Sequence, residues 1–278
     1  MPCMACGSRC FRWIARNKFF EGTDIVECHS CGLIFPYPLP PKEKVDTFYS
    51  EDYYQYNFVE TWFKKRIGTL FARSRKKWMG DWDVPLDPVQ RVLEIGAGYG
   101  SLLKALGIID MLGIEPSTEC HVHSVVFDFF GAKLQQSTFE NAKYYPPYDL
   151  IILSHVLEHL LEPRKAIDKL RNLLKPRGWL YIEIPNKFSP VYSAPSYQNV
   201  PDFYFFNRKG FEGFLSRHDL EGVISNVSIR GWQRFDKVGC AVNYLYWEAL
   251  NLLGISLLYP GDGNSFAISA AVQKQEEE

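Results

Sequence analysis

The sequence predicts an α/β protein with a mostly parallel sheet that helices cover on both faces, preceded by a small metal-binding domain. First, short apolar runs that suit buried strands alternate with segments whose apolar residues recur at helical spacing. Second, a glycine-rich turn at residues 96–100 follows the first of these strands. Third, two Cys-x2-Cys pairs lie ahead of this α/β region.

Composition places few limits on the partners of the protein. The 278 residues carry 31 basic and 32 acidic side chains, for a formal net charge of −1, which argues against a dedicated nucleic-acid binder. The apolar stretch at 242–258 is interrupted by Glu248 and Asn251 and falls short of the ~20 residues that span a bilayer. With no secretory signal visible, we expect a cytoplasmic protein without a membrane span. The sequence does not indicate an oligomeric state.

The cysteine pairs predict a zinc ribbon over residues 1–35. Cys3 and Cys6 form the first pair, and Cys28 and Cys31 form the second. Four thiolates from two such pairs suit the tetrahedral geometry of structural Zn²⁺. A disulfide pair and free thiols are the alternatives, and a reducing compartment disfavours the disulfides. Cys10 and His29, which lie close to the two pairs in the sequence, are spare candidate ligands.

Residues 36–87 are predicted to connect the ribbon to the α/β domain. A proline-rich run at 36–41 predicts a stiff extended spacer, and aromatic-rich helices should follow it. Seven basic residues fall in one stretch without an acid: Lys64, Lys65, Arg66, Arg73, Arg75, Lys76 and Lys77. This stretch is either a solvated helix face or a contact for phosphate groups.

The glycine turn predicts a site for a nucleoside cofactor. Gly96, Gly98 and Gly100 follow a short strand that contains Glu94, and Glu115 ends the next strand. Such a turn brings backbone N–H groups close to a ligand, and an acid at the end of the second strand can accept both ribose hydroxyls. A dinucleotide fingerprint would need a glycine at the sixth position of the turn, where this chain has serine.

The elements that follow occur in a specific order. An apolar strand at 148–153 leads into the sequence Ser-His-Val-Leu-Glu-His at 154–159, and a helix is predicted from Pro163 onward. A Lys-Pro-Arg-Gly turn precedes a strand at 179–184, and two further strands are predicted at 222–229 and 265–272.

Residues 88–274 together resemble the class I S-adenosylmethionine-dependent methyltransferases. The four-cysteine ribbon is similar to one found in a subgroup that acts on sugars and other small molecules. The resemblance implies a Rossmann-like, seven-stranded, mostly parallel sheet over residues 88–278. It also implies that S-adenosylmethionine is the cofactor and that the aromatic-rich residues 186–207 cover the acceptor.

The resemblance also implies which residues bind the cofactor. Glu94 is expected to order the glycine turn or bind the methionine amino group, and Glu115 to bind the ribose. Where relatives carry an aspartate that contacts adenine, this chain has serine followed by Thr138 and Phe139, and the phenyl ring is a candidate for stacking. The full set of implied cofactor-binding residues is Glu94, Gly96, Gly98, Gly100, Glu115, Pro116, Thr138, Phe139 and Ser154.

Two histidines are candidates for the catalytic base. His155 and His159 are expected to project from the same side of one helix, just after the strand that faces the cofactor. A neutral imidazole is a suitable base near pH 7. His159 matches the histidine that follows strand four in related enzymes and ranks first, with His155 second; a structural hydrogen-bonding role is the alternative.

We therefore expect a methyltransferase for a small polar acceptor, a sugar or nucleotide-sugar of surface-glycan or secondary-metabolite biosynthesis. One alternative is an RNA or protein methyltransferase that docks through the ribbon and the basic stretch. Another is a non-catalytic scaffold subunit with the same fold.

Overall fold

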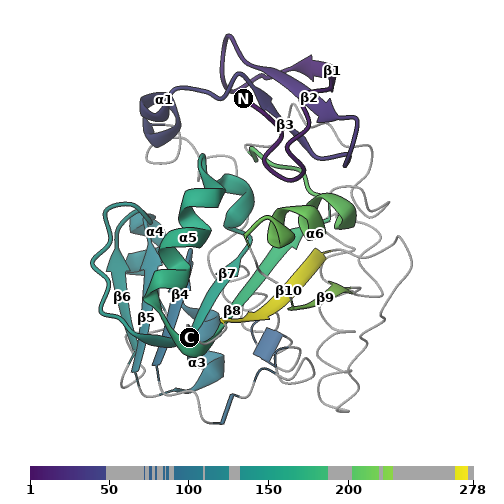
Figure 1. Cartoon of the computed structure of the whole chain (residues 1–278). Helices are drawn as coiled ribbons and strands as arrows, with labels where there is room; N and C mark the ends of the chain where they lie inside the picture. Colours follow the sequence, from purple (N-terminus) through teal and green to yellow (C-terminus); the bar gives the residue numbers. More distant parts are fainter. Residues whose placement is uncertain are drawn as a thin grey trace, which may run out of the picture.

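A computed structural model describes the part of the chain that carries both predicted domains. The described residues are 1–47, 72, 75, 76, 79, 84, 86, 87, 91–108, 110–124, 132–186, 202–218, 222–227 and 267–274. They form a 3-stranded sheet of order β1-β2-β3 and a 7-stranded sheet of order β6-β5-β4-β7-β8-β10-β9 (Figure 1).

The small sheet belongs to the N-terminal ribbon. Its antiparallel strands are β1 (Phe11–Arg16), β2 (Asp24–Cys28) and β3 (Ile34–Tyr37), and the short helix α1 (Lys42–Thr47) follows. Pro36 pairs with Ile25 inside β3. An edge strand tolerates proline because one side of its backbone makes no ladder bonds. The predicted proline spacer therefore begins later than expected, because its first two residues complete the ribbon's sheet.

Five parallel strands form the larger part of the second sheet. They are β4 (Arg91–Ile95), β5 (Asp110–Glu115), β6 (Ala132–Gln136), β7 (Tyr148–Ser154) and β8 (Leu174–Pro185). From β4 the chain first builds outward through β5 and β6, then crosses over to place β7 on the other side of β4. Ligands of open α/β sheets bind at the carboxyl ends of the strands where this reversal occurs.

Two antiparallel strands complete the sheet. β10 (Ala267–Gln273) lies between β8 and β9 (Gly222–Val227) and is antiparallel to both. Both strands fall where the sequence predicts them, and the mostly parallel α/β fold class is confirmed. The Lys-Pro-Arg-Gly segment, predicted as a turn, lies within the bounds of β8.

Side chains of adjacent residues enter different cores on the two faces of the sheet. In β4, Val92 packs in one core and Leu93 in the other, and in β7 Leu150 and Ile151 divide in the same way. This period of two is the geometry of a strand buried on both faces. Helix α3 (Ser101–Leu106) packs in the core that contains Val92, and α5 (Pro163–Leu173) packs in the other.

The remaining helical segments are short and lie in the connections between strands. The side chain of Ser117 caps α4 (Thr118–Val122), η3 (Leu157–His159) is a single 3-10 turn, and Asn207 caps α6 (Arg208–Ser216). None of the helices in the described residues combines the length and the apolar character that a bilayer-spanning helix needs. The apolar stretch at 242–258 lies outside those residues.

The ribbon and the large sheet share one apolar core. Leu33 and Phe35 of the ribbon belong to the same buried cluster as Phe211 of α6 and Ile167 of α5. Figure 1 shows α6 between the small sheet and the strands β8 and β10. The domain boundaries at residues 35 and 87 stay predictions.

Candidate active site

The glycine turn lies at the carboxyl end of β4 and requires its glycines. Gly96, Gly98 and Gly100 have φ angles of 68°, 53° and 77°, in the region that side chains disfavour. A Cβ at Gly96 would lie 2.3 Å from Cγ2 of Val156, which follows β7. The turn therefore packs directly against the segment that carries the two candidate histidines.

Glu115 is held in a fixed orientation beside this turn. Its side chain is buried at the end of β5. One carboxylate oxygen accepts from the N–H of Gly98 and the other from the N–H of Ser117, each at 2.9 Å. A carboxylate oxygen has two lone pairs, so each can accept a further donor such as a ribose hydroxyl.

Glu94 is a second buried carboxyl group on the neighbouring strand. It is 4% exposed, and its Oε2 atom has no hydrogen-bond partner among the described residues. Burial raises the pKa of Glu94 to about 8; the charge of Arg75 opposes this shift and that of Glu115 adds to it. A buried acceptor without a donor is costly, so this position suits a ligand that brings an N–H group.

A charged network at the end of β8 joins this site from the other side. Glu183 is fully buried; it accepts from Nε of Arg75 at 2.9 Å and from the Tyr181 hydroxyl at 2.9 Å. Burial alone would raise the pKa of Glu183, but Arg75 and His155 together hold it well below its usual range. The sequence offers one signal for this residue, a single acid within an apolar strand.

Part of the basic stretch is used inside the domain. Arg75 forms the buried ion pair with Glu183, and Nζ of Lys76 donates to the carbonyl of Leu106 at 3.0 Å. The expectation that the stretch is a solvated face or a phosphate contact is wrong for these two residues, because both are tied to the α/β domain. The other five basic residues lie outside the described residues.

His155 directly follows β7 in a left-handed conformation with a φ angle of 56°. Its Nε2 lies 2.9 Å from Glu183 and its Nδ1 lies 3.7 Å from Glu158. Burial lowers the pKa of His155, but the two carboxylates outweigh this effect and raise it to about 9. The imidazole is therefore positively charged near pH 7.

His159 lies in a different setting from His155. The single helix predicted to carry both is not formed: the His155 amide bonds to the carbonyl of Glu183 at 2.8 Å, and His159 ends the 3-10 turn η3. Nδ1 of His159 lies 3.6 Å from a carboxylate oxygen of Asp202, and its Nε2 lies 3.9 Å from Glu158. Asp202 is buried beside the histidine and was not a candidate from the sequence.

The other predicted cofactor residues lie around this cluster. Ser154 ends β7, and its hydroxyl lies 3.4 Å from Glu183. Pro116 and Thr138 are exposed at the ends of β5 and β6. The Phe139 ring packs 6.2 Å from Tyr144 and 4.6 Å from Nζ of a lysine, so these groups already cover part of its surface.

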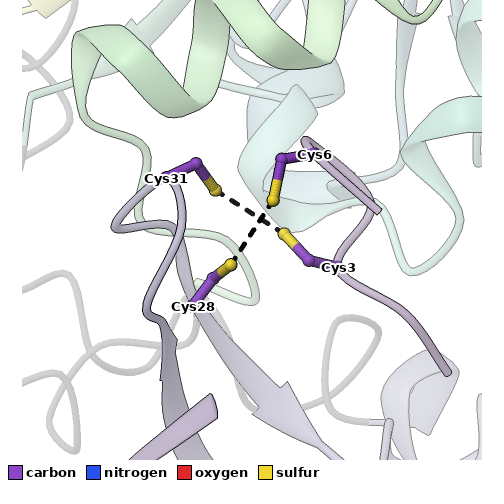
Figure 2. A group of neighbouring side chains, drawn as sticks. All are labelled: Cys3, Cys6, Cys28 and Cys31. Atoms are coloured by element: carbon purple, nitrogen blue, oxygen red, sulfur yellow. Dashed lines mark hydrogen bonds between the residues drawn. The ribbon is translucent and has the colours of Figure 1, made fainter. Parts of the chain in front are cut away.

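The four cysteines of the ribbon lie together at its end (Figure 2). The Sγ atoms of Cys3 and Cys31 are 3.7 Å apart and those of Cys6 and Cys28 are 3.5 Å apart. A tetrahedron of Zn–S bonds of ~2.3 Å separates its sulfur atoms by ~3.8 Å, whereas a disulfide needs ~2.05 Å. The thiol donor set and its spacing thus fit zinc, and Cys10 is exposed outside the group.

The fold and the site define a class. A glycine turn and a buried carboxylate bonded to it lie at the reversal point of a Rossmann-like sheet, which is where open α/β sheets bind nucleoside cofactors. The chain belongs to the family described as Methyltransferase domain, whose family model matches residues 62–227, more than half of the chain.

Curated relatives match about half of the chain. The chain is 29% identical over 158 residues to a ubiquinone biosynthesis O-methyltransferase of Vibrio atlanticus, which covers 51% of this chain and 63% of the relative. It is 27% identical over 156 residues to the protein of that name from Sodalis glossinidius, covering 51% of this chain and 57% of the relative. The chain thus spans little more than half the length of these relatives.

Solved structures share the fold. The plantazolicin methyltransferase BpumL in complex with SAH is similar with a TM-score of 0.53 and 16% identity, over 84% of this chain and 94% of BpumL. A possible histamine N-methyltransferase of Thermotoga maritima has a TM-score of 0.54 and 17% identity, over 77% and 93% of the two chains.

Proposed function

We propose that the protein is an S-adenosylmethionine-dependent methyltransferase. The observation that carries the proposal is the pair of buried carboxyl groups, Glu94 and Glu115, on either side of the glycine turn. They suit a ligand with hydroxyl donors and a cationic amino group, and the turn lacks the sixth-position glycine of a dinucleotide site. When bound, S-adenosylmethionine supplies a methyl group on a sulfonium leaving group.

Two glutamates bind the cofactor in this proposal, and a histidine removes the proton of the acceptor. Glu115 accepts from the ribose hydroxyls, and Glu94 accepts from the amino group at its free Oε2. The acceptor approaches beside the segment after β7. His159 takes the proton of the acceptor hydroxyl, because His155 is already protonated near pH 7 by its two carboxylate neighbours and has no capacity for a second proton.

We infer that the acceptor is a small polar molecule with a hydroxyl group. The O-methyltransferase names of the curated relatives support methylation at oxygen. The sugar or nucleotide-sugar expected from the ribbon-bearing subgroup is the narrower proposal, and it rests on that resemblance alone.

The RNA or protein alternative draws less support. This alternative needs the basic stretch for docking, but two of its residues, Arg75 and Lys76, form hydrogen bonds within the α/β domain. The net charge of −1 also gives no general attraction to nucleic acid.

Binding and turnover are measured separately to test the proposal. Isothermal titration should detect S-adenosylhomocysteine binding to the wild-type protein and a loss of affinity of ~100-fold or more in Glu115→Ala, because two hydrogen bonds to a charged group contribute ~1.5–3 kcal/mol each. Glu212→Ala is the control, because this carboxylate pairs with Arg208 on the exposed side of α6, and the variant should bind normally. No binding by the wild-type protein would contradict the cofactor assignment.

Methyl transfer is then assayed on sugars, nucleotide-sugars, phenols and RNA. We expect turnover with a small hydroxyl compound, and His159→Ala should lower kcat by ~100-fold with S-adenosylhomocysteine affinity within twofold. Turnover on RNA alone would favour the docking alternative. Cofactor binding with no turnover on any class would favour the scaffold alternative.

A further inference from the structure

The ribbon is bonded to the start of α6 through the second cysteine pair. Nδ2 of Asn207 donates to the carbonyl of Cys31 at 3.1 Å, while Oδ1 of the same side chain accepts from the Gly210 amide and caps the helix. Nζ of Lys209 donates to the carbonyl of Ser30 at 2.9 Å. One asparagine thus joins the cap of α6 to the backbone of a metal-ligating cysteine.

Close backbone packing supports this junction. A Cβ at Gly213 of α6 would lie 3.3 Å from the carbonyl oxygen of Ala5, between the first two cysteines. Ile34 of β3 and Phe205 exchange both backbone hydrogen bonds, at 3.3 and 2.9 Å, as an isolated antiparallel bridge. The backbone before α6 therefore extends the sheet of the ribbon.

The residues before α6 also bond, at their other end, to the 3-10 turn η3, which carries the candidate base His159. The amides of Phe203 and Tyr204 both donate to the carbonyl of Glu158, at 2.8 and 3.2 Å. The carboxylate of Asp202 lies 3.6 Å from Nδ1 of His159 and is only 7% exposed. Residues 202–207, which we term the bridge segment, thus contact the turn at one end and the ribbon at the other.

We propose that the four-cysteine ribbon is a structural part of the acceptor side of the active site: it holds the bridge segment, which places Asp202 as the positioning residue of His159. The proposal rests on the proposed function for the catalytic role of His159. The physical link from ribbon to turn stands on the contacts alone.

The chemistry explains why such a brace is useful. Asp202 lies 3.6 Å from Nδ1 of His159, whereas the Glu158 carboxylate, 3.9 Å from Nε2, also lies beside the charged His155. This arrangement favours the tautomer with its proton on Nδ1, which leaves Nε2 to receive a substrate proton. A ring displaced by ~1 Å loses that alignment. The cofactor side depends on other contacts, since Gly96 bonds to the carbonyl of Ile114 and Glu115 bonds to Gly98. Loss of the ribbon contact should therefore affect the acceptor side first.

Asn207→Asp separates the two functions of the asparagine. Aspartate keeps the oxygen that caps α6, because it is as good an N-cap as asparagine, and removes the N–H that bonds to Cys31. Arg208→Ala is the matched control: Arg208 pairs with Glu212 on the exposed face of the same helix. Amide hydrogen exchange by NMR, zinc content and S-adenosylhomocysteine affinity are measured for each protein, and for wild-type protein after zinc removal by a chelator.

We expect the amides of Phe203 and Tyr204 to exchange ~5-fold faster or more in Asn207→Asp, the effect of losing one hydrogen bond. Zinc removal should produce the same pattern, and Arg208→Ala should not. The Gly96 amide and the cofactor affinity should stay within twofold of wild type. Unchanged exchange at Phe203 in both perturbed proteins would overturn the link, and so would equal acceleration at Gly96, which indicates general destabilisation.

The positioning role is tested by Asp202→Asn, which should lower kcat by ~10-fold or more without a change in S-adenosylhomocysteine affinity, and Asp202→Glu should recover part of the loss. A kcat within twofold of wild type for Asp202→Asn would overturn this role. Absence of turnover in the wild-type protein contradicts the proposed function, whereas the exchange data still decide whether the ribbon holds the turn.

Discussion

Replacement of Glu94 by glutamine tests the cofactor assignment most directly, because it removes a titrating charge and keeps the side-chain shape. In the ligand-free protein, burial raises the pKa of Glu94 to about 8, with Arg75 opposing the shift. A carboxyl group with this pKa is ~90% protonated at pH 7. An ammonium group bound at Oε2 favours the ionised form, so Glu94 should lose ~0.9 proton per site at pH 7; the small neutral fraction of the ligand amine takes one up, and the net release is ~0.75.

The same linkage sets the pH dependence of cofactor affinity. From pH 6 to pH 7 the ionised fraction of a group with a pKa of ~8 rises from ~1% to ~9%, while a ligand α-amino group with a pKa of ~7.7–8.0 stays mostly charged. The Kd for S-adenosylhomocysteine should therefore fall about eightfold over this interval, which corresponds to ~1.2 kcal/mol. Above pH 8 the ligand amine loses its proton and the gain ends.

Calorimetric titrations in buffers with different ionisation enthalpies measure the proton release. 5′-Methylthioadenosine, which keeps the nucleoside and lacks the amino-acid group, serves as the control ligand. Wild-type protein should release a proton with S-adenosylhomocysteine and none with the control. Glu94→Gln should bind S-adenosylhomocysteine without release and with a flat Kd from pH 6 to pH 7. A pH dependence that persists in Glu94→Gln would refute the reasoning.

The glycine turn, the charge of His155 and the cysteine cluster can each be tested by substitution. Gly96→Ala should lower the free energy of unfolding in urea by ~2–4 kcal/mol, because the alanine has a strained positive φ and its Cβ lies 2.3 Å from Val156. Adding Val156→Ala should recover only the part of this loss that comes from the close contact. A change below ~0.5 kcal/mol would contradict the turn geometry. Because the pKa of His155 is raised to about 9, its charge contributes fully to the free energy of unfolding below pH 6.5, and this contribution is lost as pH rises through 9. The free energy of unfolding should therefore fall by up to ~3 kcal/mol across this window, and by less in His155→Asn. The same slope in the variant as in the wild-type protein would count against the network. Elemental analysis should find ~1 zinc per chain and much less in Cys28→Ala, while zinc-free wild-type protein of normal fold would remove the metal assignment.

The features that were predicted from the sequence depend on residues close together in the chain. Gly96, Gly98 and Gly100 have positive φ angles, and alternating glycines directly after a strand are typical of a tight turn that needs this conformation. The two cysteine pairs converge because each Cys-x2-Cys turn already aims two sulfur atoms at one point. Glu115 is the last residue of β5, so the pairing of β5 with β4 brings it beside the turn.

Contacts between distant residues were not predictable in this way. The helix expected over His155 and His159 fails because the His155 amide bonds to the backbone of Glu183 on the neighbouring strand. The pairing of Arg75 with Glu183 joins residues 108 positions apart, and no local pattern distinguishes this arginine from its basic neighbours.

The sequence by itself determined the fold class, the glycine turn and the cysteine cluster, since short-range spacing and strand periodicity fix those features. The tertiary structure alone decided that the imidazole of His155 is charged and which carboxylate faces His159. It also decided that the ribbon packs on α6 and that the segment before α6 bonds to the turn that carries His159. These outcomes depend on burial and on electrostatic fields, which arise only after remote strands and loops have packed together.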